Sequence, residues 1–553
     1  MKHKYLKVTL FVICGVCIGL LLYPVVGADS IYQQLEKYRY VFGTAVKEYV
    51  EEVDSNTLTE AAIKGMLNEL DPHSTYITAK DMQSVDEEMQ GSFEGIGVQF
   101  NLLNDTISVI APIKNGPSEK LGILSGDKIV EIDGKSAIGL PLDSVPKLLR
   151  GPKGTVVKLG IYRYGEKNLL HFDVVRDKIP LYTVDSYYIY DNSDIGVIRL
   201  NRFAQTTHEE LMKAARDLKS QGMKKLILDL RENPGGYLNQ AFLVADEFLS
   251  GDTIVYTKTR KEENNEVYKA RAGQELEDIP LIILINSGSA SASEIVSGSV
   301  QDMDRGLIVG TTSFGKGLVQ RQFKIPDGSA FRLTIARYYT ASGRCIQRPY
   351  KDKDSYRNLV GRLELEEGLN LEHAIDKIKK EEANKKQKKT NIKDTNGIDL
   401  DSIEIFHTRA GRPVLGGGGI TPDYVIKSDT VTKLTVRIRM KNLYNKFINN
   451  EFKNPQKIKE QYNSDFELFN KKFEITDAMI KKFKSLAIEE GVEWDEERAK
   501  IDAPYWKLSM KAILARAIWD TNCEARIFSK VDRQLQTAAT LFPIAEKIKN
   551  KKK

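Results

Sequence analysis

The amino-acid sequence predicts an α/β protein of several domains, and three observations carry this prediction. The chain has 553 residues, too many for a single hydrophobic core. Short apolar runs alternate with helical periodicity between residues 194 and 310, which is typical of a layered α/β domain. The flanking segments have other patterns: residues 91–179 predict short strands separated by glycine turns, and residues 29–90 and 428–553 predict helices.

The composition gives no indication of nucleic-acid binding, a disulfide framework or a metal site. Hydrophobic residues make up 41% and charged residues 29% of the chain, as in ordinary folded proteins. The net charge of +6 is spread over 82 basic and 76 acidic residues, which does not indicate nucleic-acid binding. Only Cys345 and Cys523 lie beyond the N-terminal apolar stretch, so at most one disulfide is possible there. The histidines are scattered and show no metal-ligand spacing, so we expect no metal or other cofactor.

The first 28 residues have the pattern of a targeting segment. Three lysines at positions 2, 4 and 7 precede an uncharged stretch from Val8 to Val26. This pattern fits either a cleaved signal peptide or an uncleaved membrane anchor, and Val26-Gly27-Ala28 resembles a signal-peptidase site. Either alternative exports the rest of the chain.

The segment from residue 29 to residue 90 is predicted to be helical. Leu35, Tyr38 and Phe42 begin an apolar stripe at helical spacing, and a second stripe ends at Asp71-Pro72, where proline stops the helix. Asp71, His73 and Ser74 are the residue types of a catalytic triad. They are too close in sequence to adopt triad geometry easily, so we expect His73 to be structural.

The stretch from Leu281 to Gln320 contains the strongest candidate for a catalytic site. A buried strand is predicted over Leu281–Ile285, a helix from about Ser293 to Gly306, and a second strand over Leu307–Val309. Serines lie between the first strand and the helix. A serine on such a turn projects from the sheet, and the free N–H groups of the helix N-terminus can stabilise an oxyanion.

A nucleophilic serine needs a base, and none of the six histidines lies in this stretch. Lys316 is nearer, between small and apolar neighbours such as Phe314 and Leu318. Burial can lower the pKa of a lysine until its neutral amine acts as a base. The sequence therefore predicts a Ser-Lys dyad. The alternative is a loop of small residues beside a solvated lysine.

These residues resemble the carboxy-terminal processing, or tail-specific, serine proteases. The motif S-A-S-A-S-E contains Ser291, and F-G-K-G contains Lys316 after 316 − 291 = 25 positions. Gln320 follows four positions later, which we expect to be one helical turn. The resemblance implies that Ser291 is the nucleophile, Lys316 the general base and Gln320 the group that orients its amine. Its register excludes Ser287, Ser289 and Ser293 as the nucleophile. The family also implies a crotonase-like, Clp-type α/β core.

A second glycine turn follows the strand predicted at Lys225–Leu230 and precedes a helix predicted at Leu238–Leu249. By resemblance, Gly235 or Gly236 supplies one oxyanion-hole donor and Ala292 supplies the other. A phosphate-binding loop is the rival interpretation, but the Gly-Lys-Ser/Thr ending is missing. The resemblance also implies that Tyr338, Tyr339 and Arg344 lie near the cleft, although ordinary strand packing explains them as well.

Residues 91–179 resemble a PDZ domain. The turn Gly95-Ile96-Gly97-Val98 precedes a strand, and its backbone N–H groups can hold the carboxylate of a peptide C-terminus. Arg150 follows the predicted helix Leu142–Leu149, whose Leu148 and Leu149 would line an apolar pocket with Val98. The charge of Arg150 either steers the peptide or is simply solvated. Pro146 fits only a first turn, so this helix is expected to begin near Ser144.

The predicted order of domains follows from these boundaries. A leader is followed by a helical region, the PDZ domain, a protease core with a charged insertion, and a C-terminal helical region (1–28; 29–90; 91–179; 180–351 with 404–427; 352–403; 428–553). No motif assigns a role to the C-terminal region, which could cap a cleft, mediate self-association or bind a partner.

The expected protein is an exported serine endopeptidase that recognises polypeptide C-termini. The resemblance places it in the bacterial cell envelope, either in the periplasm or anchored in the inner membrane facing the periplasm. Its expected partners are protein or peptide substrates, and a homo-oligomer remains open. One alternative is a membrane-linked PDZ scaffold whose protease-like core has lost catalysis. Another is an active core held inactive until a C-terminus or a partner binds.

Overall fold

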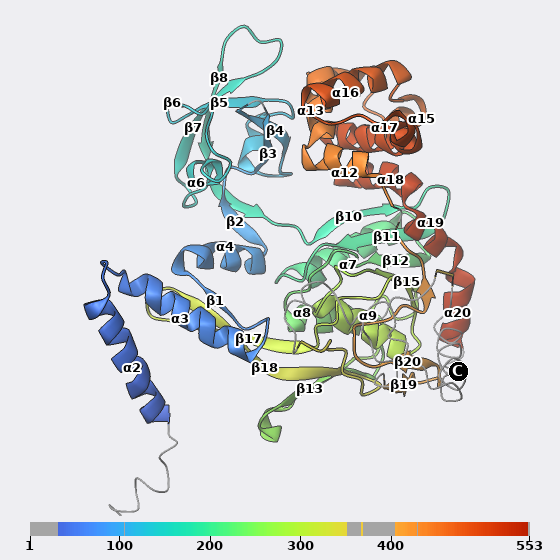
Figure 1. Ribbon diagram of the computed structural model, residues 1–553. Coiled ribbons are helices and arrows are strands. Elements are labelled where there is room, and N and C mark those ends of the chain that lie inside the picture. Colours follow the sequence, from blue (N-terminus) through green and yellow to red (C-terminus); the bar gives the residue numbers. More distant parts are fainter. Residues whose placement is uncertain (1–30, 104, 351–366, 369–403, 429, 551–553) are drawn as a thin grey trace, which may run out of the picture. The chain divides into compact units, whose positions relative to one another are not determined.

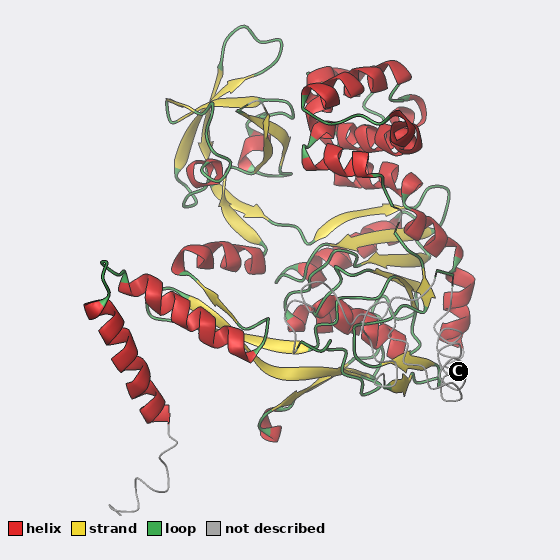
Figure 2. Cartoon of the chain, viewed as in Figure 1, coloured by secondary structure: helices red, strands yellow, loops and turns green. Residues whose placement is uncertain are grey.

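The computed structural model describes residues 31–103, 105–350, 367–368, 404–428 and 430–550 (Figures 1 and 2). The chain divides into two compact units, one formed by residues up to Tyr76 with residues 331–333 and the other by the rest. The predicted leader and all but two residues of the predicted insertion lie outside the described residues, so both stay predictions. No described helix is both long and apolar enough to cross a membrane.

The described part of the first unit contains two helices, α2 (Ile31–Glu48) and α3 (Ser55–Leu70). The carboxylate of Asp54 caps α3 by accepting hydrogen bonds from two backbone N–H groups, each 3.1 Å long. Strand β1 (Thr75–Ile77) leads into the second unit. The helical periodicity of the sequence is therefore realised in this region.

The second unit begins with helix α4 (Ala79–Gln90). A body rich in strands, residues 92–180, follows this helix. Its larger sheet has the order β3-β4-β5-β7-β8, with β6 paired to β5, and a smaller sheet pairs β2 with β9. The predicted PDZ helix is α6 (Val145–Leu149), which has Ser144 at its N-cap and Pro146 in its first turn. The remaining elements are β2 (Ser92–Gly95), β3 (Val98–Leu103), β4 (Thr106–Pro112), α5 (Pro117–Lys120), β5 (Lys128–Ile132), β6 (Lys135–Ser136), β7 (Val156–Tyr162), β8 (Leu170–Val175) and β9 (Asp177–Pro180).

A six-stranded mixed sheet forms the centre of the predicted protease core, in the order β10-β11-β12-β15-β16-β21. Only the β10–β11 pair is antiparallel. Every residue of β15 is buried, because both faces of the sheet are covered. The strands are β10 (Val184–Ile189), β11 (Ile195–Leu200), β12 (Lys225–Asp229), β15 (Leu281–Ile285), β16 (Leu307–Gly310) and β21 (Tyr424–Val425).

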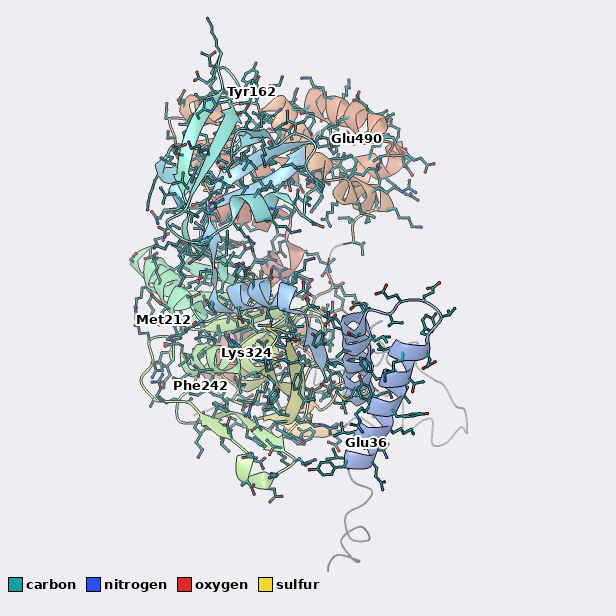
Figure 3. The ribbon with its side chains drawn as sticks, turned by 90° about the vertical axis from the view of Figure 1, so that its left-hand side faces the viewer. Glu36, Tyr162, Met212, Phe242, Lys324 and Glu490 are labelled. Atoms are coloured by element: carbon teal, nitrogen blue, oxygen red, sulfur yellow. The ribbon has the colours of Figure 1, made fainter. Side chains whose placement is uncertain are left out.

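Helices cover this sheet on both faces. On one face pack α7 (Thr207–Ser220), α8 (Leu238–Asp246) and α9 (Ala292–Asp302), with Met212 of α7 and Phe242 of α8 labelled in Figure 3. On the other face pack α19 (Arg533–Thr540) and α20 (Phe542–Asn550). Alternate residues of β15 join the two cores: Ile283 and Ile285 face α9, whereas Ile282 and Leu284 face α19 and α20.

A second, antiparallel sheet lies beside α9. Strand β18 (Ala330–Thr340) pairs with β13 (Thr253–Thr259) and also with β17 (Leu318–Lys324), and β13 pairs with β14 (Val267–Lys269). The 3-10 helix η1 (Glu262–Asn264) joins β13 to β14. A separate hairpin pairs β19 (Ile405–His407) with β20 (Pro413–Leu415).

The C-terminal region has its own core, built around the fully buried Trp506. The sequence predicted helices over residues 428–553, and the structure separates the last of them at Trp519-Asp520 and Asp532, where aspartates act as N-caps. The helices are α12 (Lys433–Met440), α13 (Leu443–Glu451), α14 (Pro455–Gln461), α15 (Phe466–Lys472), α16 (Asp477–Glu489), α17 (Glu496–Ile518), α18 (Thr521–Phe528) and η3 (Ser529–Val531).

Candidate active site

Ser291 occupies a strained turn between β15 and α9. Its backbone has φ +54° and ψ −110°, a sparsely populated region for a residue with a side chain. Such a conformation costs about 1–3 kcal/mol and persists only where neighbouring groups enforce it. The carbonyl of Ser291 accepts hydrogen bonds from the N–H groups of Glu294 (2.9 Å) and Ile295 (3.0 Å), so the strained residue directly starts the helix.

Lys316 and Gln320 form a direct hydrogen bond. The Nζ of Lys316 donates to Oε1 of Gln320 over 2.8 Å, and both side chains are partly buried. Lys316 lies in the loop before β17, and Gln320 lies on that strand rather than one helical turn later. The spacing of four still brings them together, because residues an even number apart point to the same side of an extended chain.

The fully buried carboxylate of Glu294 connects the Ser291 turn to the loop that contains Lys316. Its Oε2 accepts the backbone N–H groups of Ser291 (2.8 Å) and Lys316 (2.9 Å). Its Oε1 accepts the hydroxyl of Ser313 (2.5 Å) and the N–H of Gly315 (2.7 Å). Burial raises the pKa of Glu294, and the four hydrogen bonds oppose that shift.

Tyr338 of β18 contacts the same two residues from their carbonyl side. Its hydroxyl lies 2.7 Å from the carbonyl oxygen of Lys316 and 3.1 Å from that of Ser291. The side chain is only 1% exposed, so the phenol is held in place by packing. Glu294 and Tyr338 therefore bridge the backbones of Ser291 and Lys316 at their N–H and C=O groups respectively.

The glycine turn after β12 lies against the Ser291 turn. A Cβ atom on Gly235 would be 2.9 Å from the Ala292 nitrogen, 2.9 Å from the Cβ of Ser291 and 2.7 Å from the carbonyl oxygen of Ala290. Real Cβ atoms do not approach other atoms this closely, so only glycine fits here. The two turns predicted to hold an oxyanion are thus in contact.

Asn233 distinguishes the two candidate glycines. Its Oδ1 accepts the N–H of Gly235 (2.9 Å), so that N–H is already engaged. Within the described part of the chain, no acceptor is seen for the N–H of the exposed Gly236 or for that of Ala292 at the start of α9. The backbone carbonyl of Asn233 also accepts the N–H of Ala290 (3.0 Å), which ties the two turns together.

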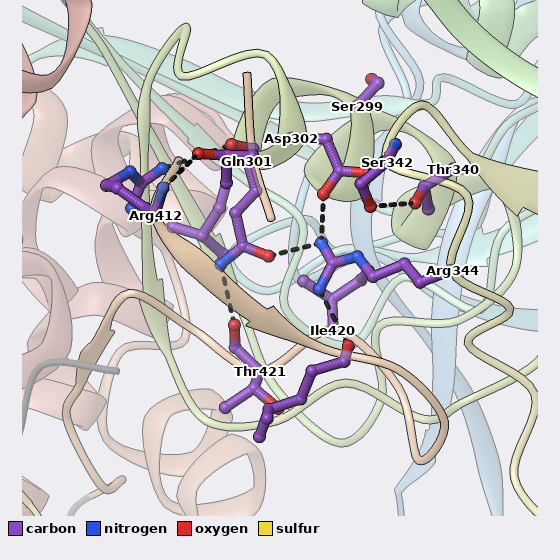
Figure 4. Close-up of polar contacts among 12 residues, drawn as sticks. Ser299, Gln301, Asp302, Thr340, Ser342, Arg344, Arg412, Ile420 and Thr421 are labelled. Atoms are coloured by element: carbon purple, nitrogen blue, oxygen red, sulfur yellow. Dashed lines mark hydrogen bonds and ion pairs between the residues drawn. The ribbon is translucent and has the colours of Figure 1, made fainter. Parts of the chain in front are cut away.

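The opposite end of α9 is anchored by buried ions (Figure 4). Arg344 and Asp302 are both fully buried and form an ion pair of 2.7 Å. The guanidinium also donates to Oε1 of Gln301 (2.6 Å) and to the carbonyl of Leu415 (3.0 Å). Arg344 is thus part of the framework rather than of an open cleft, and Tyr339 stacks on Tyr256 with ring centroids 5.3 Å apart.

The residues predicted to hold a peptide C-terminus form a tight turn before β3. Gly97 has φ +73°, which favours glycine, and its carbonyl accepts the N–H of Ile113 (2.9 Å). Among the described residues, no acceptor is seen for the N–H groups of Ile96 and Gly97. The side chain of Ile96 is buried in the core of this body, so only its backbone is available to a ligand.

The other predicted groove residues differ in how accessible they are. Val98 is partly buried and Leu148 is exposed, whereas Leu149 is buried in the core. Arg150 is not a freely solvated charge: its guanidinium pairs with Glu87 of α4 (2.6 Å) and lies 4.6 Å from the ring centroid of Phe93.

The Asp71–Ser74 segment has the geometry of a turn. The carboxylate of Asp71 accepts the backbone N–H groups of His73 (2.7 Å) and Ser74 (2.8 Å) and the hydroxyl of Ser74 (2.7 Å). These three hydrogen bonds make the Asp71 side chain the cap of this turn. Within the described residues, no cluster of histidine, cysteine, aspartate or glutamate side chains is suited to a metal ion.

Family models match four regions of the chain. A model described as Peptidase family S41 matches residues 194–355, and one described as PDZ domain matches residues 95–174. The N-terminal domain model of the activating protease CtpB matches residues 26–81. A model of a family of unknown function matches residues 434–520.

Solved structures related to parts of the chain include the photosystem II D1 C-terminal processing protease, at 28% identity and a TM-score of 0.33. That match covers 58% of this chain and 84% of the other. The PDZ domain of a carboxy-terminal protease from Vibrio cholerae, in complex with peptide, is 32% identical with a TM-score of 0.16. It covers 16% of this chain and 99% of the other. Neither TM-score is high enough to support an argument.

The curated relatives are more informative. The carboxy-terminal processing protease CtpA of Bacillus subtilis is 37% identical over 321 residues, which cover 58% of this chain and 67% of that protein. The carboxy-terminal-processing protease of Bartonella bacilliformis is 41% identical over 323 residues, which cover 58% of this chain and 74% of that protein. With this degree of identity over most of a relative's length, the chain belongs to the carboxy-terminal processing serine proteases of peptidase family S41.

Proposed function

We propose that this protease is an exported endopeptidase that binds polypeptide C-termini through its PDZ domain and cleaves peptide bonds with a Ser291–Lys316 dyad. One observation carries the proposal: Glu294 and Tyr338 each bind the backbones of both Ser291 and Lys316. Two residues 25 positions apart are thereby held as one unit, as a nucleophile and its base must be.

In this mechanism the neutral amine of Lys316 removes the proton of the Ser291 hydroxyl as Oγ attacks the scissile carbonyl carbon. Gln320 orients the amine by accepting one of its hydrogens. The tetrahedral intermediate places its negative oxygen near the N–H groups of Gly236 and Ala292, because the N–H of Gly235 is engaged by Asn233. When the C–N bond breaks, Lys316 returns the proton to the leaving amine.

The second half of the reaction releases the acyl group from the enzyme. Lys316, neutral again, takes a proton from a water molecule as that water attacks the acyl-enzyme ester. A second tetrahedral intermediate forms and collapses, the C–O bond to Ser291 breaks, and Ser291 regains its proton. Acid, base and nucleophile are thus all supplied by side chains, with the backbone stabilising charge.

The proposed ligand of the PDZ domain is the carboxylate of a polypeptide chain. The N–H groups of Ile96 and Gly97 would donate to that carboxylate, and the exposed Leu148 would contact the last side chain of the peptide. Arg150 would contribute only after exchanging its pairing with Glu87. The predicted leader supports the proposal that the site faces the periplasm of a bacterium, with the chain either released or anchored in the inner membrane.

The experiment compares wild-type enzyme with Ser291→Ala and Lys316→Ala on a peptide that has either a free or an amidated C-terminus. Lys324→Ala is the matched control, because Lys324 is exposed on the neighbouring strand β17. We expect both dyad variants to lose cleavage, the control to retain it, and amidation to raise KM. Cleavage by Ser291→Ala or Lys316→Ala at the wild-type rate would refute the dyad, and equal KM values would refute recognition of the carboxylate.

A further inference from the structure

Two buried side chains hold the backbones of Ser291 and Lys316 from opposite sides. A single oxygen of Glu294 accepts both N–H groups, at 2.8 and 2.9 Å, and the hydroxyl of Tyr338 lies within 3.1 Å of both carbonyl oxygens. The side chains come from different elements, α9 and β18, so the positions of the two loops are fixed with respect to each other by two independent parts of the fold.

The hydrogen-bond pattern fits an ionised Glu294. Three of its four partners are backbone N–H groups, which can only donate. The fourth is the hydroxyl of Ser313, whose oxygen accepts the N–H of Ile420 over 2.6 Å and whose hydrogen can point to Glu294. A carboxylate satisfies all four partners, and these hydrogen bonds oppose the rise in the pKa of Glu294 that burial causes.

We propose that Glu294 and Tyr338 are positioning residues that set the distance between the Ser291 hydroxyl and the Lys316 amine. Each side chain acts through the two backbones that it binds. The inference rests on the proposed function, in which the side chains of Ser291 and Lys316 exchange a proton. We call the pair of side chains Glu294 and Tyr338 the clamp. The clamp enforces the strained φ of Ser291 and fixes the position from which the Lys316 side chain projects.

Tyr338→Phe is the sharpest test, because it removes only the hydroxyl and keeps the buried ring. We expect kcat to fall about 10- to 100-fold, since a small misplacement of reacting groups costs up to about 100-fold in rate. KM should stay within about twofold, because the phenol has no role in binding substrate. The control is Tyr187→Phe, which removes a hydroxyl that donates to Asp217 over 3.0 Å on the side of β10 and α7.

Glu294→Gln tests the other half of the clamp. In this variant an amide NH2 group replaces one carboxylate oxygen and faces two hydrogen-bond donors, where that oxygen accepted two hydrogen bonds. We therefore expect a larger loss of kcat than for Tyr338→Phe, again with little change in KM. Glu294→Asp keeps the charge but shortens the reach, and should not restore kcat. If Glu294→Gln does not fold, Tyr338→Phe alone decides the proposal.

The outcomes separate the clamp from the dyad. If Ser291→Ala and Lys316→Ala are inactive while Tyr338→Phe keeps the kcat of Tyr187→Phe, the clamp is wrong and the proposed function stands. A melting temperature for Tyr338→Phe far below that of Tyr187→Phe, with kcat recovered at low temperature, would also reduce its role to stability. Activity in Ser291→Ala would instead refute the proposed function itself.

Discussion

The two ends of helix α9 each bury an acidic side chain, yet they satisfy it in opposite ways. At the N-terminal end, Glu294 accepts hydrogen bonds from neutral groups alone, two of which belong to the backbones of Ser291 and Lys316. At the C-terminal end, Asp302 pairs with the guanidinium of Arg344, and neither side chain is exposed. One end contains the candidate nucleophile and the other holds the helix to the surrounding strands.

The comparison shows how a strained site is supported. Burial raises the pKa of Glu294, because a buried carboxylate loses its hydration, and the hydrogen bonds that oppose this shift come from backbone groups and a hydroxyl rather than from a counter-ion. The ion pair at the other end compensates its own charges and adds contacts to Gln301 and Leu415. We therefore expect changes at the N-terminal end to lower activity, and changes at the C-terminal end to lower stability first.

Among the changes that leave Ser291 and Lys316 in place, Gly235→Ala at the N-terminal end of α9 should lower kcat the most. The new methyl group would lie 2.9 Å from the Ala292 nitrogen and so obstruct the proposed oxyanion site. Loss of one oxyanion donor typically lowers kcat about 100- to 1000-fold, and we expect a loss in that range. Steady-state kinetics on a peptide substrate would measure it.

Gly222→Ala is the matched control, because it separates backbone strain from obstruction. Gly222 has φ +97° against +96° for Gly235, but nothing lies within 4 Å of its Cβ position. The control should therefore pay the same conformational cost without losing activity. Equal kcat values for the two alanine variants would show that the Gly235 turn does not border the reacting groups.

Arg344→Leu tests the C-terminal end. Removing the guanidinium leaves Asp302 buried without its partner, which typically costs about 3–5 kcal/mol. Urea unfolding followed by circular dichroism should show this decrease in the free energy of unfolding. Adding Asp302→Asn to Arg344→Leu removes the uncompensated charge and should recover part of the loss; a single-variant change below about 1 kcal/mol would contradict the anchoring role.

Lys511 is a buried basic side chain, in contrast to the buried acids of α9. Its Nζ donates a hydrogen bond to the backbone carbonyl of Asn470 over 2.8 Å. Burial lowers its pKa from 10.5 to about 8. The unfolded chain therefore binds more protons than the folded chain between about pH 8 and 10.5, so this group's contribution to stability increases with pH across that window.

Lys511→Met should remove that contribution and flatten the dependence of unfolding free energy on pH in the same window. The expected effect is the smallest of those described, because it concerns one side chain of the C-terminal helical core. Urea unfolding at pH 8 and pH 10 for both proteins would measure it. An unchanged slope in the methionine variant would show that Lys511 is solvated and charged.

The strands and helices of the catalytic region were largely predictable from the sequence. Five consecutive apolar residues predicted β15 because both faces of that strand are covered, and its bounds agree with the prediction. Helix boundaries were less predictable: α8 ends at Asp246 rather than Leu249. Gln320 lies on a strand where a helical turn was expected, since a spacing of four fits one face of either element.

Contacts between distant residues were not predictable. The pattern Ser291-x-x-Glu294 is the signature of a capping box and could have indicated the bond from Glu294 to the Ser291 N–H. No local pattern indicates that the same oxygen binds the N–H of Lys316, because that contact depends on how β16 and the following loop return to α9. Asn233, which occupies the Gly235 N–H, carried no recognisable signal.

The central claim is tested most directly by the rate at which a fluorophosphonate probe phosphonylates Ser291, forming an O–P bond and releasing fluoride, measured by mass spectrometry of the labelled peptide. The wild-type protein and Lys324→Ala should form the adduct at equal rates. Lys316→Ala should form it about 100- to 10,000-fold more slowly, the contribution typical of a general base. Labelling of Lys316→Ala at the wild-type rate, or of a serine other than Ser291, would contradict the account.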